Sequence, residues 1–324
     1  MATSFAKVQA ERISHLYHRL RNAWPIWFYV LNARPRRLWR QERVQLDAVQ
    51  QTIAETLARD GIAIIPLKDI MKSDAFFAGM RAYVEKRLAD PAVIAEGARR
   101  KTLLAERSQE GKKSGGKYLK DFWVSLFPAD EQGKVLYEKD NPFLKFLMTR
   151  RVLDVAATYF GFLPKLNSFM LQQTLLVPPG APAYLSQRWH RDPEDKKMLK
   201  VFIYMTDVND VGAGPFTYVK GSQLGGRWRH VFPQRPPAGS YPPEGEVEKI
   251  VPKSDIQVCL APAGTVIFCD TSGLHRGGYS TTTQRVLLLP AFSSRASKNP
   301  INFHRPDQSV IAGMNPVAQY ALLP

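Results

Sequence analysis

The chain has 324 residues, of which 44% are apolar, so it can bury a large core and is not globally disordered. Its net charge of +16 indicates attraction to polyanions such as nucleic acid, anionic lipid or a phosphorylated substrate, although a soluble basic enzyme has the same balance. Two cysteines, Cys259 and Cys269, do not make a disulfide framework and favour a reducing compartment. The sequence has no apolar run of the roughly 20 residues that span a membrane. Its N-terminus lacks a signal peptide's apolar core, so we expect a cytoplasmic protein.

Residues 1–43 differ from the rest of the chain. Residues 7–43 hold nine basic residues against two acidic ones and enclose the segment AWPIWFYVLNA at 23–33. Aromatic residues flanked by arginines are typical of a helix in the headgroup region of a membrane, here on the inner face. The alternative is an arm that packs its aromatics on the main domain or on a second subunit. We therefore separate a basic aromatic arm, a candidate membrane-surface anchor, from a domain at 44–324.

The spacing of apolar residues predicts the elements of that domain. Helices are expected over 44–59, 74–88 and 141–160, with a short buried strand, IAIIP, after the first. Residues 99–120 carry eight basic residues, two acidic ones and SGG, which predicts a basic loop. Strands are expected at 168–177, 199–206, 216–219, 257–260, 265–269 and 285–292. The pattern predicts an α+β fold in which N-terminal helices pack on a C-terminal β-sandwich or jelly roll.

The triplet His190-Arg191-Asp192 is the sharpest chemical feature. Residues i and i+2 of an extended segment lie on the same side, so His190 and Asp192 can bind one metal together. An isolated triplet of this kind is also typical of a surface turn. Among the other histidines, His275 stands directly after a predicted strand, in GTVIFCDTSGLHRGG. Two histidines and one carboxylate on a face leave coordination positions open, as in non-haem iron(II) oxygenases.

Arg285 follows His275 by ten residues and begins the segment VLLLPAF. An arginine on this strand can bind a dicarboxylate co-substrate through a two-pronged salt bridge. A structural salt bridge at a strand edge is the alternative for Arg285. The combination of His-x-Asp, a distal histidine and an arginine about ten residues later is more specific than any of its parts.

These motifs resemble the phytanoyl-CoA dioxygenase family. The resemblance covers roughly residues 52–295 and rests on HRD at 190–192, GAGPFTYVKGSQ at 212–223 and GTVIFCDTSGLHRGGYSTTTQR at 264–285. It implies a double-stranded β-helix (a cupin-like jelly roll) that uses Fe(II), 2-oxoglutarate and dioxygen to hydroxylate an aliphatic carbon, with release of succinate and CO2. Some members are halogenases with a small residue in place of the carboxylate, and Asp192 argues against that activity here.

Carried over residue by residue, the resemblance makes His190, Asp192 and His275 the iron ligands. Arg285 would bind the far carboxylate of 2-oxoglutarate. Gln172 and Thr174, on the strand before the triplet, would help to hold this co-substrate. The alternative for these two residues is ordinary hydrogen bonding within the sheet.

Several functions remain open at this point. One is hydroxylation of a lipid, an acyl derivative or a lipid-linked glycan at an anionic membrane surface, which would use the iron site and the arm together. Another is a soluble hydroxylase of a small metabolite or natural product, with the arm used for dimerisation. A nucleic-acid oxygenase or binding module is a third, but the sequence has no recognisable nucleic-acid motif, and no nucleic-acid partner is expected. A catalytically inactive binding protein is the fourth. The substrate and the oligomeric state cannot be deduced from the sequence.

Overall fold

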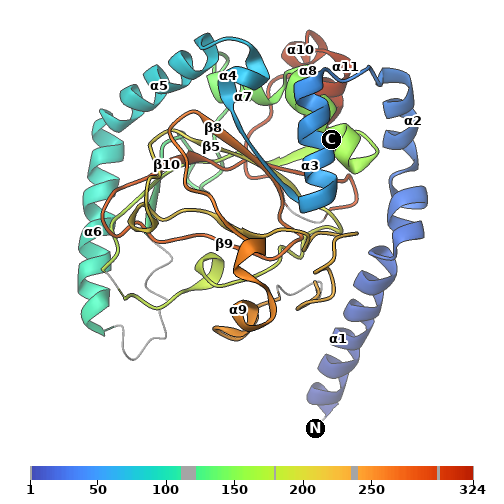
Figure 1. The fold of residues 1–324 in the computed structure, drawn as a ribbon, viewed down its shortest axis with the longest axis horizontal. Helices are drawn as coiled ribbons and strands as arrows, with labels where there is room; N and C mark the ends of the chain where they lie inside the picture. Colours follow the sequence, from blue (N-terminus) through green and yellow to red (C-terminus); the bar gives the residue numbers. More distant parts are fainter. Residues whose placement is uncertain (1, 111–121, 179, 235–239, 298–299, 324) are drawn as a thin grey trace.

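The computed structural model describes residues 2–110, 122–178, 180–234, 240–297 and 300–323. Within these residues, two antiparallel sheets are surrounded by helices (Figure 1). An eight-stranded sheet has the order β1-β8-β5-β10-β4-β2, and β11 joins β3 to β5 beside it. Its strands are β1 (Ile62–Pro66), β2 (Trp123–Ser125), β3 (Lys165–Ser168), β4 (Leu171–Thr174), β5 (Leu199–Tyr204), β8 (Thr265–Asp270), β10 (Val286–Leu288) and β11 (Ala291–Ser293). The second sheet is β7-β6-β9, made of β6 (Thr217–Val219), β7 (Ile256–Val258) and β9 (His275–Arg276).

Most of the helices precede the strands along the chain, as the sequence predicts. The arm contains α1 (Ala2–Arg21), the π-helical segment η1 (Ile26–Leu31) and α2 (Ala33–Glu42). The domain adds α3 (Ala48–Asp60), α4 (Leu67–Met71), α5 (Ala75–Leu88), α6 (Pro91–Glu110), α7 (Pro142–Leu147), α8 (Arg150–Phe160), α9 (Glu246–Ile250), α10 (Gln308–Ala312) and α11 (Pro316–Leu322). Single 3-10 turns lie at η3 (Leu185–Gln187), η4 (Val211–Ala213) and η5 (Lys253–Asp255).

The central strand β5 separates two apolar cores. Its alternate residues Val201 and Ile203 belong to the large core that the helices share, whereas Phe202 and Tyr204 belong to a smaller core. Ile267 of β8 and Leu287 of β10 lie in the same smaller core. Because residues two apart on a strand point to the same side, this alternation defines an interior face of the main sheet. That face and its extension carry the candidate site.

The predicted helix boundaries need three corrections. The first helix begins at 48 rather than 44, because Asp47 caps it through a hydrogen bond from the Gln50 amide, and it ends at Gly61 with a φ of 77°. The predicted helix over 141–160 is two helices separated at Met148 and Thr149. The predicted basic loop at 99–120 is helical up to 110 as part of α6, and 111–120 lie outside the described residues.

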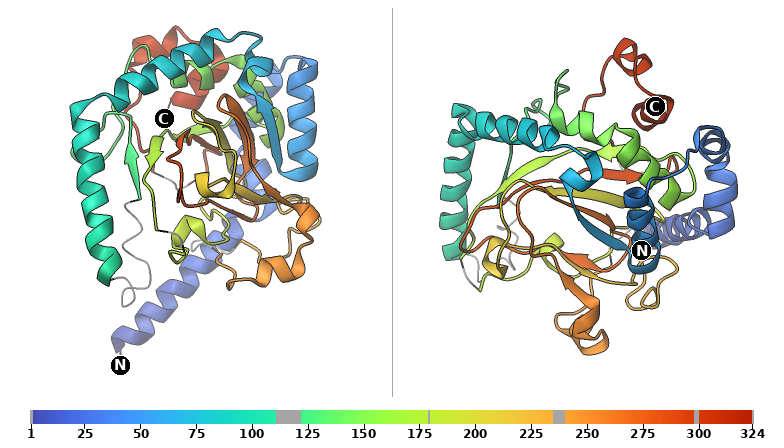
Figure 2. Two further views of the ribbon diagram at one scale, coloured as in Figure 1. Left: turned by 60° about the vertical axis from the view of Figure 1, so that its left-hand side comes forward. Right: turned by 45° about the horizontal axis from the view of Figure 1, so that its top comes forward.

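The arm behaves differently at its two ends. Its helix α1 extends away from the body of the molecule (Figure 1 and the left view of Figure 2). Its aromatic segment packs on the domain instead: Trp27 is 0% exposed and meets Phe162 edge to face at 5.2 Å. The expectation that the aromatic segment lies in a membrane is therefore wrong for Trp27, because this side chain is part of the protein core. Trp24, 38% exposed, stacks on Phe28 at 4.7 Å between ring centroids.

A membrane span is not found among the helices that the structure describes, since none is both long and apolar enough to cross a bilayer.

Candidate metal centre

Backbone pairing brings the two predicted histidines side by side. His190 and His275 form an antiparallel bridge in which each amide donates to the other's carbonyl, at 2.9 and 3.0 Å. The Asp192 amide then donates to the Thr271 carbonyl at 2.9 Å, which continues the pairing along the segment. The bridge places two residues from distant parts of the sequence on one face of the chain. Asp192, two residues after His190, projects from the same side.

The ligand atoms of the three side chains converge on one point. Asp192 Oδ1 lies 3.6 Å from His190 Nε2 and 3.8 Å from His275 Nε2, and one ligand atom from each residue falls within 4.8 Å of the others. All three residues are buried. The structure thus assembles the predicted two-histidine, one-carboxylate set.

The outer nitrogen of each histidine is fixed by the backbone. His190 Nδ1 lies 2.9 Å from the Arg188 carbonyl, and His275 Nδ1 lies 3.0 Å from the Gly273 carbonyl. A carbonyl accepts only, so each Nδ1 carries the proton and each Nε2 keeps a free lone pair toward Asp192. Burial lowers the pKa of both imidazoles, and the proximity of His190 lowers the pKa of His275 further. Both rings are therefore in the neutral form that ligates metals.

Gly273 is required where it supplies that carbonyl. A Cβ at this position would lie 2.1 Å from the Tyr218 hydroxyl and 2.8 Å from Ser222 Oγ. The close approach of these two side chains leaves room only for glycine.

Lys200, on the interior face of β5, is a residue of the site that was not predicted from the sequence. Its Nζ lies 2.7 Å from Asp192 Oδ2, while Oδ1 faces the histidines. Burial acts to raise the pKa of Asp192, but the ammonium group of Lys200 outweighs it and holds that pKa below the ordinary value. The carboxylate is thus ionised, and only one of its oxygens points into the site. Lys200 stands two residues before Phe202 on a strand, which is the alternation that places it inside.

Arg191, between the two predicted ligands, points away from them and holds the surrounding loops. Its guanidinium donates to the carbonyls of Ser222 at 2.6 Å, Ser272 at 2.8 Å, Phe232 at 2.8 Å, Val231 at 2.9 Å and Trp228 at 3.2 Å. Burial lowers the pKa of Arg191 to about 10. This residue clamps the loop at 222–232 to the segment that leads into His275.

Asp195 anchors the other end of the triplet. Its Oδ1 accepts a hydrogen bond from Trp27 Nε1 at 2.6 Å, and its Oδ2 accepts one from the Ser294 amide at 2.7 Å. Asp195 is fully buried. The arm therefore contacts the chain at Asp195, three residues after Asp192 in the sequence. The sequence could not indicate this pair, since 168 residues separate its members.

Arg285 lies in the smaller core with one donor unused. Its guanidinium donates to the Gly214 carbonyl and stands 5.9 Å from the centroid of the Tyr204 ring. Its Nε is buried and has no hydrogen-bond partner among the described residues. Phe216, whose amide donates to the Tyr204 hydroxyl, lies 5.7 Å from the His275 ring and so links Arg285 to the three converging side chains.

Gln172 and Thr174 lie on β4 beside this arginine. Gln172 pairs in register with Leu287, which in turn pairs with Tyr204 of the smaller core. The Thr174 hydroxyl accepts from the Arg285 amide at 2.8 Å and lies 2.5 Å from Ser280 Oγ. Thr174 is therefore engaged in hydrogen bonding within the fold, where it holds the backbone of Arg285.

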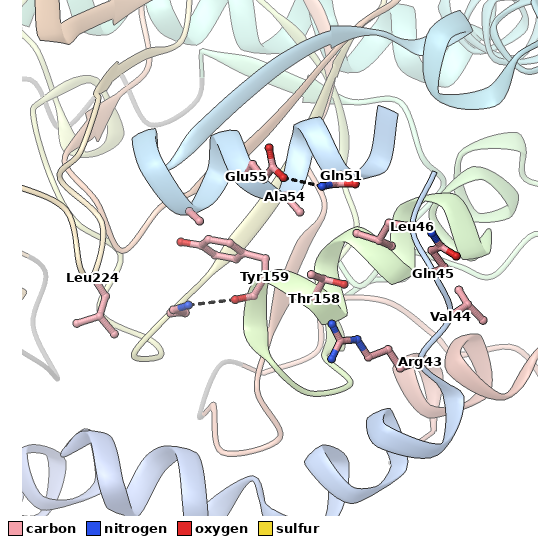
Figure 3. A pocket seen from close by; sticks show the side chains of 12 residues that line it. Arg43, Val44, Gln45, Leu46, Gln51, Ala54, Glu55, Thr158, Tyr159 and Leu224 are labelled. Carbon is pink, nitrogen blue, oxygen red and sulfur yellow. Dashed lines mark hydrogen bonds between the residues drawn. The ribbon is translucent and has the colours of Figure 1, made fainter. Parts of the chain in front are cut away.

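A groove of about 750 Å³ lies away from this cluster. It runs between α3, α8 and the segment 43–46, and Tyr159 and Leu224 border it (Figure 3). None of the three converging side chains lines the groove.

Comparison with known proteins gives distant structural likenesses only. No family model and no curated protein matches the sequence. Iron-bound EctD from S. alaskensis shares 16% identity over 81% of this chain and 82% of its own, with a TM-score of 0.48. The non-haem alpha-ketoglutarate-dependent epimerase SnoN from nogalamycin biosynthesis shares 15% over 76% and 84%, with a TM-score of 0.46. HygX from Streptomyces hygroscopicus, with nickel and 2-oxoglutarate bound, shares 13% over 78% and 88%, with a TM-score of 0.41. These values are too low to assign an activity to the chain.

Proposed function

We propose that this protein is an Fe(II)- and 2-oxoglutarate-dependent dioxygenase of the phytanoyl-CoA dioxygenase-like group, with a double-stranded β-helix core. The observation that carries the proposal is the convergence of His190, Asp192 and His275 with both Nε2 atoms and a single carboxylate oxygen facing one point. Two imidazoles and one carboxylate suit Fe(II) and leave positions for a co-substrate and dioxygen.

The surrounding residues fit 2-oxoglutarate as well. Arg285 offers a buried guanidinium whose Nε lacks a partner among the described residues, and a carboxylate is the group that such a fork binds best. Thr174 fixes the backbone of that arginine through its hydroxyl. When bound, Fe(II) with 2-oxoglutarate and dioxygen supplies the oxidation of an aliphatic C–H bond, with release of succinate and CO2.

The chain's own groups set the geometry of that chemistry. The Arg188 and Gly273 carbonyls orient the imidazoles, and Lys200 holds the second oxygen of Asp192 away from the metal position. Phe202 and Phe216, with ring centroids 4.7 Å apart, wall one side and exclude water. Tyr241 stacks on His190 at 5.8 Å, and we assign it to the wall on the substrate side.

A small metabolite or natural product is the substrate class that we favour over a lipid. The lipid hypothesis depended on the aromatic segment of the arm, and in this fold Trp27 and Phe28 are engaged by the domain. A role at an anionic membrane would instead fall to α1, where Ile13, Leu16 and Leu20 are exposed at helical spacing. Vesicle co-sedimentation of a variant with Leu16→Ser and Leu20→Ser tests this second candidate, because loss of binding would support it.

The proposal is tested by anaerobic addition of Fe(II) and 2-oxoglutarate to the full-length protein. Chelation of the metal by the keto acid should produce a visible charge-transfer absorption, and air should then convert 2-oxoglutarate to succinate even without a prime substrate. His275→Ala should show neither. Absence of both signals in the wild-type protein would contradict the proposal.

A further inference from the structure

A basic pocket of about 520 Å³ opens where α2, β3 and α11 meet. Four cationic side chains line it: Arg34 from α2, Lys165 from β3, and Arg295 and Arg305 from the segments that follow β11. No aspartate or glutamate is among the residues that line it. The volume lies in the range of small-molecule sites, which is about 300 to 1,000 Å³.

Within the described residues, the cationic side chains of this pocket have no carboxylate partner. In the part of the chain that the structure describes, no carboxylate lies within ion-pair distance of Arg34, Arg295 or Arg305. Burial lowers the pKa of Lys165 to about 8, and repulsion from these three arginines adds to the effect. Like charges held together in this way favour a bound anion.

Lys165 is held rigidly in place. Its Nζ donates to the carbonyls of Tyr320 at 2.5 Å and Leu323 at 2.9 Å, and it lies 3.7 Å from the centroid of the Tyr320 ring. These bonds satisfy the carboxyl end of α11, and the ammonium charge remains at the pocket wall.

The uncharged polar groups of the wall also favour an anion. Asn167 is buried, and its Oδ1 accepts a hydrogen bond from Ser293 Oγ, so its amide nitrogen remains to donate. Guanidinium, ammonium and amide groups are all donors, and arginine forks match phosphate and carboxylate oxygens. Four cations around one cavity select a dianion over a monocarboxylate.

We propose that the pocket of Arg34, Lys165, Arg295 and Arg305 binds the phosphate group of a phosphorylated molecule. Its volume leaves room for more than a phosphate, so the ligand is a phosphate ester whose remainder extends toward the opening. The source is either a soluble phosphorylated metabolite or the headgroup of an anionic lipid, which share this chemistry. The site does not depend on the proposed metal centre, so either proposal can fail without the other.

Isothermal titration calorimetry of the full-length, metal-free protein at low ionic strength tests this proposal, with inorganic phosphate and pyrophosphate as probes. The variant with Arg34→Gln and Arg305→Gln should bind pyrophosphate about tenfold more weakly than the wild type, or worse. The matched control, Arg37→Gln with Arg40→Gln, removes two exposed arginines of α2 outside the pocket and should change the affinity less than twofold.

Equal weakening in both double variants would assign the binding to net charge and overturn the proposal, as would a wild-type protein that binds neither probe. Arg295→Gln, an exposed position, repeats the test if the first pair lowers the thermal stability. Vesicles that contain phosphatidic acid, whose phosphomonoester headgroup can carry two negative charges, then identify the source. If they displace pyrophosphate and lose binding only in the pocket variant, the ligand is a headgroup. If pyrophosphate binding is specific and vesicles do not compete, it is a soluble phosphate ester.

Discussion

The hydrogen bond between Trp27 and Asp195 can be tested by Trp27→Phe, which deletes the indole donor and keeps an aromatic ring. The donor is 0% exposed, and its carboxyl partner keeps hydrogen bonds from the Lys196 and Ser294 amides. A hydrogen bond to a charged group contributes about 1.5 to 3 kcal/mol to stability. The smaller ring of phenylalanine also leaves a cavity, which lowers the stability further. We expect the free energy of unfolding to fall by about 2 to 4 kcal/mol.

Urea denaturation measures this loss as a lower midpoint at an unchanged slope. Trp24→Phe is the control, because Trp24 is a neighbouring, partly exposed tryptophan of the same arm for which the equivalent change should cost less than about 1 kcal/mol. Since Asp195 follows Asp192 by three residues, Trp27→Phe should also weaken Fe(II) binding, and Trp24→Phe should not. Equal effects of the two substitutions on stability and on metal affinity would refute the reasoning.

Three further predictions concern the metal centre, the co-substrate and the basic pocket. His190→Ala, Asp192→Ala and His275→Ala should each lower the affinity for Co(II), measured by titration, by more than about 100-fold while the circular dichroism spectrum stays native; unchanged affinity removes that residue from the ligand set. Arg285→Ala should raise the KM for 2-oxoglutarate far more than the KM for the prime substrate, because loss of one partner of a buried ion pair costs about 3 to 5 kcal/mol, and an equal rise in both would assign the role elsewhere. The folded-state pKa of Lys165, about 8, lies below its ordinary 10.5, so the unfolded chain binds more protons between these values and stability rises with pH there. Urea denaturation across this pH range should therefore show a rise in the free energy of unfolding of up to about 3 kcal/mol for the wild type that is missing in Lys165→Met. Parallel curves of stability against pH for the two proteins would contradict this.

The order of elements was largely predictable because it rests on local patterns. The strand at Ile62–Pro66 and the helix ending at Leu88 follow from apolar spacing and from turn residues that act within a few positions. The boundaries were less accurate because short-range interactions override the spacing. Asp47 caps its helix three residues inside the predicted start, and the predicted helix over 141–160 breaks at Met148.

The convergence of His190, Asp192 and His275 was predictable for a different reason. His190 and Asp192 are related by strand geometry alone, and only a few histidines were available to complete the set. Lys200 was not predicted as a site residue because no local sequence pattern identifies a lysine near the start of a buried strand. Its partner Asp192 is eight residues away and becomes a neighbour only when β5 pairs with β8.

The fate of the arm depended on contacts that no local pattern contains. An aromatic segment flanked by arginines has the same composition whether its rings enter a membrane or a protein core. Trp27 packs in the protein core because its indole donor satisfies the buried carboxyl group of Asp195, 168 positions later in the sequence. A lipid chain offers no such partner. The same contact explains why an arm outside the resemblance to the oxygenase family would matter to the site. It fixes the segment that follows Asp192, so the arm and the metal centre should lose stability together when the contact is removed.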